Sequence, residues 1–111
     1  MDSQLLWGTI ELLILEVVSH APSYGYQITQ TVATRSKGEF ELKEGSLYPA
    51  LHRMERQKLL ASFWQEVDGR RRKYYKITSG GQKALAARKE EWLGYAKGVQ
   101  GVIGGHQWAV S

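Results

Sequence analysis

The residues with the most evident chemical potential form a basic run in the second half of the chain. Arg70, Arg71, Arg72 and Lys73 are consecutive, and two tyrosines follow them. Adjacent cations repel one another, and phosphate groups that neutralise them make such a run tolerable. The alternative is structural, because charged side chains also protect the edge of a β-sheet from pairing with other chains. Taken alone, the run leaves phosphate binding and edge protection open.

A second group of polar residues precedes this run at helical spacing. An arginine can form paired hydrogen bonds with guanine, and hydroxyl or imidazole groups can reach phosphates and base edges. Polar helix faces are common, so this group by itself is a weak signal. A basic helix face followed by a basic run favours nucleic-acid binding over a merely solvated surface. The group consists of Ser46, Tyr48, His52, Arg53 and Arg56.

The distribution of charge agrees with this interpretation. The net charge is +4; residues 43–76 hold nine basic and four acidic side chains, whereas residues 1–42 hold two basic and five acidic ones. A localised basic stretch is the usual electrostatic sign of nucleic-acid binding. The chain has no cysteine, which excludes disulfides and thiolate metal sites and agrees with the cytoplasmic location that we expect.

The elements that must position these residues follow from hydrophobic periodicity. An apolar stripe predicts a first helix over residues 4–20, which Pro22 cannot continue. Glu11 and Glu16 interrupt the apolar run, so we interpret it as a buried helix and expect no membrane contact.

Two shorter helices should follow the first. Ser23 is the expected N-cap of the second helix, which should end near residues 36–38. Ser46 is the expected N-cap of the third helix, with Pro49 in its first turn. If Leu47, Ala50, Leu51 and Met54 face inward, the polar group described above faces outward.

A hairpin and a long helix complete the chain. Asp68-Gly69 is a strong turn signal between two expected strands, residues 60–67 and 70–77. Thr78 should cap a last helix that Gly104-Gly105 ends. Its apolar residues recur at heptad-like spacing, with a gap at Lys89, and predict a seam of Leu85, Trp92, Ala96, Val99 and Ile103.

The order helix, helix, helix, hairpin, helix predicts a mainly α fold with a small β-hairpin. This is the order of a winged helix-turn-helix with an additional C-terminal helix. We expect residues 1–78 to form a DNA-binding domain, residues 79–105 a dimerisation helix and residues 106–111 a tail. In such a module the third helix enters the major groove, and the hairpin, or wing, reaches the neighbouring backbone.

Several blocks of the sequence resemble the PadR family of transcriptional regulators. Residues 24–28, Tyr-Gly-Tyr-Gln-Ile, are similar to the second-helix signature of the family. Residues 44–51, Glu-Gly-Ser-Leu-Tyr-Pro-Ala-Leu, are similar to its recognition-helix signature. Residues 59–60 and 73–81 are similar to its wing and to the entry of the following helix. Together the blocks span about residues 5–85 in the right order.

The resemblance implies a homodimeric repressor, in which the C-terminal helix and part of the first helix form the dimer. It implies duplex DNA with an inverted-repeat operator as the partner. It also implies that Tyr24, Ser46, Tyr48 and Pro49 lie at the DNA surface, with Arg71 to Lys73 in the wing. The short C-terminal part resembles the compact subfamily with a single helix after the wing.

The aromatic residues near the C-terminal seam are candidates for an effector site. Some relatives that the chain resembles bind flat hydrophobic or phenolic molecules between their subunits, against aromatic residues of the dimer helix. Trp92 and Tyr95 are the first candidates here, and Trp7 is the next. Plain dimer packing is the alternative, and we favour it because aromatic residues on such a seam are usually core.

No catalytic or metal-binding pattern accompanies these features. His20, His52 and His106 are too scattered for a metal site, so we expect no metal, no cofactor and no enzymatic activity. We predict a sequence-specific DNA-binding transcriptional regulator, a homodimeric repressor released by a small-molecule effector. The alternative is a winged helix that mediates protein or RNA contacts. A steep salt dependence and a preference for palindromic duplex DNA would distinguish the DNA-binding regulator from this alternative.

Overall fold

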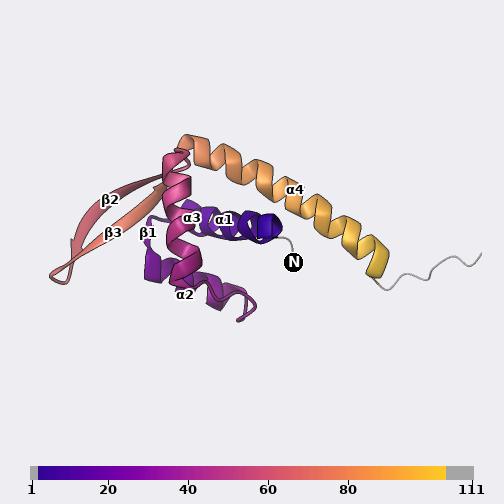
Figure 1. Ribbon diagram of the computed structural model, residues 1–111, viewed down its shortest axis with the longest axis horizontal. Coiled ribbons are helices and arrows are strands. Elements are labelled where there is room, and N and C mark those ends of the chain that lie inside the picture. Colours follow the sequence, from indigo (N-terminus) through magenta and orange to yellow (C-terminus); the bar gives the residue numbers. More distant parts are fainter. Residues whose placement is uncertain (1–2, 105–111) are drawn as a thin grey trace, which may run out of the picture.

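A computed structural model describes the backbone of residues 3–104 and the side chains of residues 8–104. It begins with α1 (Ser3–His20), the helix expected from the first apolar stripe. The remaining elements are β1 (Ser23–Tyr24), α2 (Gly25–Arg35), α3 (Glu44–Arg56), β2 (Leu60–Val67), β3 (Arg70–Ile77) and α4 (Ser79–Ile103). This arrangement is the expected mainly α fold with a winged helix-turn-helix order (Figure 1).

The hydrophobic core gathers around α1, which contacts α2, α3, α4 and β3. Ile14 and Leu15 at the centre of α1 are completely buried, because these four elements cover the apolar side of the helix. The four residues expected to form the inner face of α3 are all buried, as are Ile28 of α2 and Tyr75 of β3. The buried side of α3 therefore fixes which residues its opposite side can expose.

The β-hairpin has the expected strands and turn. Asp68 and Gly69 both have positive φ angles, 52° and 77°, as a tight two-residue hairpin turn requires. The sequence analysis missed one strand. In β1, Ser23 pairs with Tyr75 and Tyr24 pairs with Tyr74, so the sheet has three strands in the order β1-β3-β2.

Both serine caps expected from the sequence are wrong. Ser23 lies in β1, where its hydroxyl donates a hydrogen bond to the Ala21 carbonyl, and the N-cap of α2 is Tyr24 without a side-chain bond. The third helix starts three residues earlier than expected, at Glu44, so Ser46 lies inside its first turn and Lys43 is the N-cap. Pro49 consequently lies in the second turn, where it removes the donor that the Gly45 carbonyl would otherwise accept.

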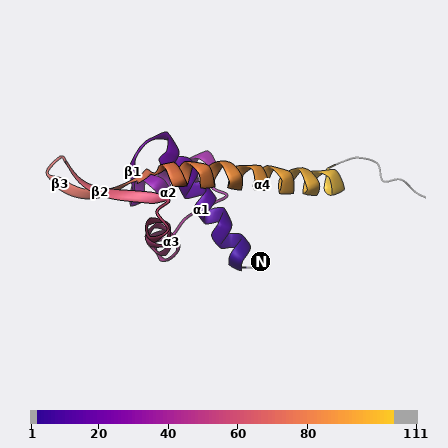
Figure 2. The ribbon, with the colours of Figure 1, turned by 90° about the horizontal axis from the view of Figure 1, so that it is seen from above.

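Helix α4 begins at the body and extends far from it. The Thr78 hydroxyl accepts a hydrogen bond from the Gly81 N–H at 2.9 Å, which confirms the expected cap. The wing and the distal half of α4 point in opposite directions along the 68 Å length of the molecule (Figures 1 and 2). Leu85 departs from the expected seam, because it is buried in the core of its own chain.

Gly81 allows the close approach of α4 to Leu59, the residue that precedes β2. A Cβ at Gly81 would clash with the Leu59 carbonyl oxygen and lie 2.7 Å from Ile77, whereas a Cβ at Gly80 has its nearest contact at 3.5 Å. We therefore expect Gly81→Ala to lower the free energy of unfolding by about 1–3 kcal/mol, the usual cost of overpacking. Gly80→Ala should instead gain up to about 1 kcal/mol, because alanine favours a helix over glycine.

Urea unfolding of the two glycine variants compares one added methyl group at adjacent positions. Equal stabilisation by both substitutions would contradict the close approach of α4 to Leu59.

Among residues 3–104, no helix is long and apolar enough to cross a membrane. The same part of the chain holds no cluster of three or more histidine or acidic residues arranged for a metal ion.

Candidate nucleic-acid interface

The exposed face of α3 carries most of the polar group identified in the sequence. Tyr48, Pro49, His52 and Arg56 are exposed, and Ser46 is half-buried at the start of the helix. Their positions follow from the amphipathic pattern, because the apolar residues between them face the core. This face offers phenol, imidazole and guanidinium groups that can reach phosphates or base edges.

Arg53 does not belong to this face, so the expectation that it points outward is wrong. Its side chain turns toward α1, where its Nε lies 3.4 Å from Oε2 of Glu11. The second oxygen of Glu11 accepts from Nη1 of Arg88 in α4 at 3.1 Å. A buried carboxylate requires such partners, because an uncompensated charge inside a protein is costly. An acidic residue between Ile10 and Ile14 on the apolar stripe was the sequence signal for this network.

Tyr48 is held in place by the glycine at the start of α2. A Cβ at Gly25 would lie 2.6 Å from the Tyr48 hydroxyl oxygen and 3.1 Å from the nearest atom of its ring. The absence of a side chain at Gly25 therefore makes room for the phenol of α3 against the first turn of α2. This contact joins the two blocks of sequence that contain Tyr24-Gly25 and Leu47-Tyr48-Pro49.

The base of the wing is an aromatic cluster. Tyr24 meets Tyr74 edge to face at 5.4 Å between ring centroids, and Phe63 stacks on Tyr74 at 5.6 Å. Such pairs add rigidity and about 0.5–1.5 kcal/mol each beyond the area that they bury. The wing is thus anchored to the body through β1, the strand that the sequence analysis missed.

The three arginines of the wing differ in their surroundings. The Arg72 guanidinium lies 4.4 Å from the centroid of the Tyr24 ring, and that of Arg71 lies 5.0 Å from the Trp64 ring. Arg70, beside the turn, is exposed. Rings of this kind attract a cation and limit the motion of its side chain. Arg71 is exposed as well, despite its contact with Trp64, whereas Arg72 is half-buried against Tyr24.

Lys73 is less available for phosphate than the arginines. Its Nζ lies 3.8 Å from Oε1 of Glu55 and 5.5 Å from the Tyr75 ring centroid. Glu55 also accepts a hydrogen bond from Ser62, which fixes the carboxylate next to the lysine. Burial raises the pKa of the Tyr75 hydroxyl above its usual value, although the nearby Lys73 opposes this shift. Tyr75 consequently remains a neutral phenol under the inner end of the wing.

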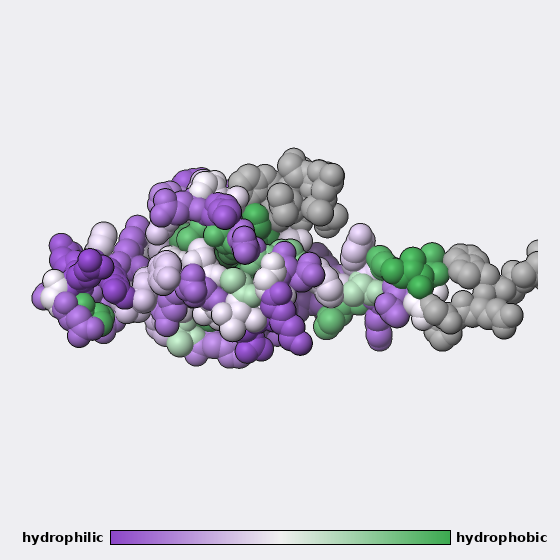
Figure 3. All heavy atoms as spheres, turned by 90° about the horizontal axis from the view of Figure 1, so that it is seen from below, coloured by the Kyte–Doolittle hydropathy of each residue, from purple (hydrophilic) through white to green (hydrophobic). Residues whose placement is uncertain are grey.

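A groove of about 680 Å³ connects the exposed face of α3 with the wing. Its lining combines aromatic side chains with cations, which suits phosphates and sugars. Hydrophilic residues cover most of the wing in Figure 3. The groove is lined by Tyr24, Gly25, Tyr26, Tyr48, His52, Trp64, Arg70, Arg72, Lys73 and Tyr75.

The distal half of α4 exposes apolar side chains at the opposite end of the molecule. Trp92, Tyr95 and Val99 are exposed to 47%, 60% and 39%, and Ala96 is half-buried. Val102 and Ile103 continue the exposed apolar surface toward the end of the helix (Figure 3). A surface of this kind usually marks an interaction site. The Trp7 side chain lies outside the residues whose side chains are described.

Comparisons with known proteins agree with this geometry. The model of the transcriptional regulator PadR-like family matches residues 14–87. A transcriptional regulator of Mycobacterium tuberculosis is 34% identical over 94 residues, which are 85% of each chain. A solved structure from Streptococcus mutans is 39% identical with a TM-score of 0.81 and covers 94% of each chain. A PadR family regulator from Clostridium difficile is 38% identical with a TM-score of 0.72 and covers 86% of this chain and 98% of its own.

Proposed function

The chain belongs to the PadR-like family of transcriptional regulators, and we propose that it is a homodimeric repressor that reads an inverted-repeat operator. In this proposal α3 enters the major groove and the wing contacts the adjacent phosphates. The observation that carries it is the continuous groove between the exposed face of α3 and the cations of the wing. Tyr24, Ser46 and Pro49 border this surface, and Arg56 extends it along α3.

His52 is the residue of α3 that we expect to read a base. It is exposed near the middle of the helix and lines the groove beside Tyr48. We expect His52→Ala to weaken binding to the preferred duplex by about 1–3 kcal/mol and to alter the preferred sequence. Selection from a random duplex library, followed by anisotropy titrations, measures both effects. An unchanged consensus would mean that His52 contacts only phosphate.

The control for His52 is Lys83→Ala, which removes a charge from an exposed position on α4. It should leave both affinity and consensus unchanged. Arg53→Ala should act mainly through stability, because Arg53 is paired with Glu11. If the protein instead binds single-stranded RNA as tightly as duplex DNA, or shows no salt dependence, the alternative of a protein- or RNA-interaction module is favoured.

Self-association through α4 is the second part of the proposal. Trp92, Tyr95, Ala96 and Val99 supply an apolar face that a second copy could bury, and Trp7 is a further candidate. We expect Trp92→Ala or Val99→Glu to weaken the dimer by about tenfold or more, since truncating a central apolar anchor often costs above 1.4 kcal/mol. DNA affinity should fall with it, because paired half-sites need paired subunits.

Light scattering at micromolar concentration checks the dimer directly. Gln100→Glu is the matched control for Val99→Glu, because it adds the same charge at the next residue of the helix. It should change association less than Val99→Glu. A monomeric wild type would contradict the dimer and leave the DNA-binding proposal to be judged on its own.

The aromatic pair on α4 is the place where a hydrophobic or phenolic effector would bind the proposed dimer. Trp92 and Tyr95 are exposed one helical turn apart, so both rings can contact one flat molecule. We propose that such a molecule would release the repressor from DNA by changing how the two copies of α4 pack. Loss of release in Tyr95→Ala, with dimerisation retained, would support this role.

A further inference from the structure

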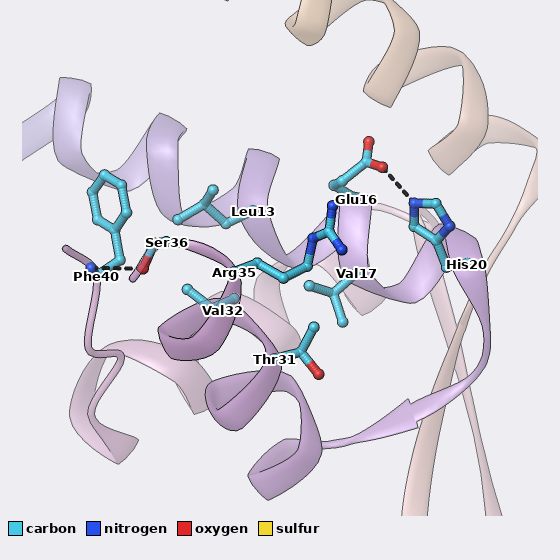
Figure 4. A pocket seen from close by; sticks show the side chains of 9 residues that line it. All are labelled: Leu13, Glu16, Val17, His20, Thr31, Val32, Arg35, Ser36 and Phe40. Atoms are coloured by element: carbon cyan, nitrogen blue, oxygen red, sulfur yellow. Dashed lines mark hydrogen bonds and ion pairs between the residues drawn. The ribbon is translucent and has the colours of Figure 1, made fainter. Parts of the chain in front are cut away.

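A separate cavity of about 480 Å³ lies between α1 and α2, away from both the DNA-facing groove and the aromatic pair of α4. Leu13 and Val17 of α1 face Thr31 and Val32 of α2 across it, and Phe40 lies at one end (Figure 4). Its volume falls within the range of about 300–1,000 Å³ that is usual for small-molecule sites. The cavity is therefore large enough for a ligand with a short apolar body.

The segment after α2 keeps this cavity in shape. The Gly38 N–H donates to the Ala33 carbonyl at 2.8 Å, and the Phe40 N–H donates to the Ser36 hydroxyl at 3.0 Å. Lys37 and Gly38 have positive φ angles of 53° and 82°, which turn the chain back toward α1. These bonds place Phe40 beside the opening without any ligand being needed to order it.

The polar residues at the opening have an excess of positive charge. Glu16 is engaged by Lys89 of α4 at 2.9 Å and by His20 at 2.7 Å. The hydrogen bond from Lys89 lowers the pKa of Glu16 despite its partial burial, so this carboxylate remains ionised at neutral pH. Arg35 extends from α2 into the same opening and forms no ion pair with any residue that the structure describes.

The position of Arg35 at the end of α2 has a structural explanation as well. A cation in the last turn of a helix interacts favourably with the helix dipole. That interaction does not require the side chain to reach across the cavity opening toward α1, as it does in Figure 4. A guanidinium at the rim of an apolar cavity is the group best suited to bind a carboxylate.

We propose that this cavity binds small amphipathic monocarboxylates, whose apolar body enters between α1 and α2 and whose carboxylate pairs with Arg35. The apolar walls select an aliphatic chain or a single ring, and Arg35 selects the acid over the corresponding alcohol or amine. Lys89 balances the charge of Glu16, so Arg35 is, among the described residues, the cation left at the opening for an anionic ligand. This site is independent of the proposed effector contact at Trp92 and Tyr95.

Octanoate, octanol and octylamine test the site as three probes with the same chain length and different charge. In isothermal titration of the full chain, octanoate should bind at least about tenfold more tightly than octanol, since a charge-assisted hydrogen bond contributes about this factor. Octylamine should bind more weakly than octanol. Arg35→Gln should weaken octanoate about tenfold and leave octanol unchanged, whereas Lys83→Gln should change neither.

Val17→Phe provides a test that does not depend on charge, because a larger side chain would fill the cavity and exclude octanoate and octanol alike. Equal affinity for octanoate and octanol in the wild type would overturn the carboxylate preference. No binding of any probe would overturn the site and indicate that a second copy covers it. NMR shifts centred on Trp92 instead of Val17 and Val32 would overturn its location. Binding of duplex DNA, measured on the same preparation, tests the proposed regulatory function separately from this site.

Discussion

Replacing Glu11 with alanine should lower the free energy of unfolding by about 2–3 kcal/mol, the largest stability effect that we expect from a polar side chain on α1. Removing one member of a buried ion pair typically costs about 3–5 kcal/mol, because the remaining charge is left without a partner. Arg53 and Arg88 retain about 30% exposure, so their guanidinium groups can recover part of this cost from water. The expected loss is therefore smaller than for a fully buried pair.

Glu16→Ala is a matched control on the same helix. Glu16 is also acidic and also contacts two basic side chains, Lys89 and His20, but its side chain is 37% exposed, against 10% for Glu11. Surface pairs of this kind contribute about 0–1 kcal/mol. Chemical unfolding should therefore give a clearly larger loss for Glu11→Ala than for Glu16→Ala. Equal losses would show that the carboxylate of Glu11 does not organise the interior.

The Glu11 network also connects the two proposed functional surfaces. One carboxylate of α1 holds Arg53 of α3 through one oxygen and Arg88 of α4 through the other. The helix proposed to read DNA and the helix proposed to form the dimer are thus fixed to the same side chain. Glu11→Gln keeps the hydrogen-bonding shape and loses the charge, so its cost should be intermediate between wild type and Glu11→Ala.

Hydrophobic periodicity and turn chemistry were sufficient to predict the helices and the hairpin. The apolar stripes of α1 and α3 face the core as expected, and Asp68-Gly69 forms the expected turn. These features depend on residues that are close in sequence, so local patterns contain the necessary information. The family blocks indicated the same order of elements and are confirmed by the family match.

The errors concern interactions between residues that are distant in sequence. Strand β1 exists because Ser23 and Tyr24 pair with Tyr75 and Tyr74, about fifty positions later. Arg53 turns inward because Glu11, on another helix, needs a counter-charge. Leu85 is buried in the core although its spacing fits the seam of α4. Helical spacing alone cannot show whether a residue faces its own chain or a second copy.

Replacing Arg70, Arg71 and Arg72 together with alanine should produce the largest change in DNA affinity. Each neutralised phosphate releases condensed counterions, with a slope near −0.9 in a plot of log affinity against log salt. The triple variant should therefore flatten this slope by up to about three units per subunit. Losing several phosphate contacts lowers affinity by about a hundredfold or more near physiological salt. Lys83→Ala, far from the wing in sequence, should leave the slope unchanged.

Arg72, which is half-buried, and Arg70, which is exposed, should contribute unequally to DNA binding. Arg72 is held over Tyr24, so binding a phosphate costs it less side-chain entropy than it costs Arg70. Arg72→Ala should consequently weaken binding more than Arg70→Ala does. Titrations of both single variants at several salt concentrations measure this difference. Equal losses would mean that the contact with Tyr24 does not preposition Arg72.

The selected duplex and a random duplex should lose affinity by similar factors in the triple variant, because phosphates have the same charge in every sequence. The competing mechanism is an arginine that enters the minor groove and senses its width. In that case the selected duplex would lose more than random DNA, and duplexes with A·T-rich flanks would lose most. An unchanged salt slope on both duplexes would remove the wing from DNA contact. The arginines would then serve as charged protection of a hairpin edge, the alternative that the sequence left open.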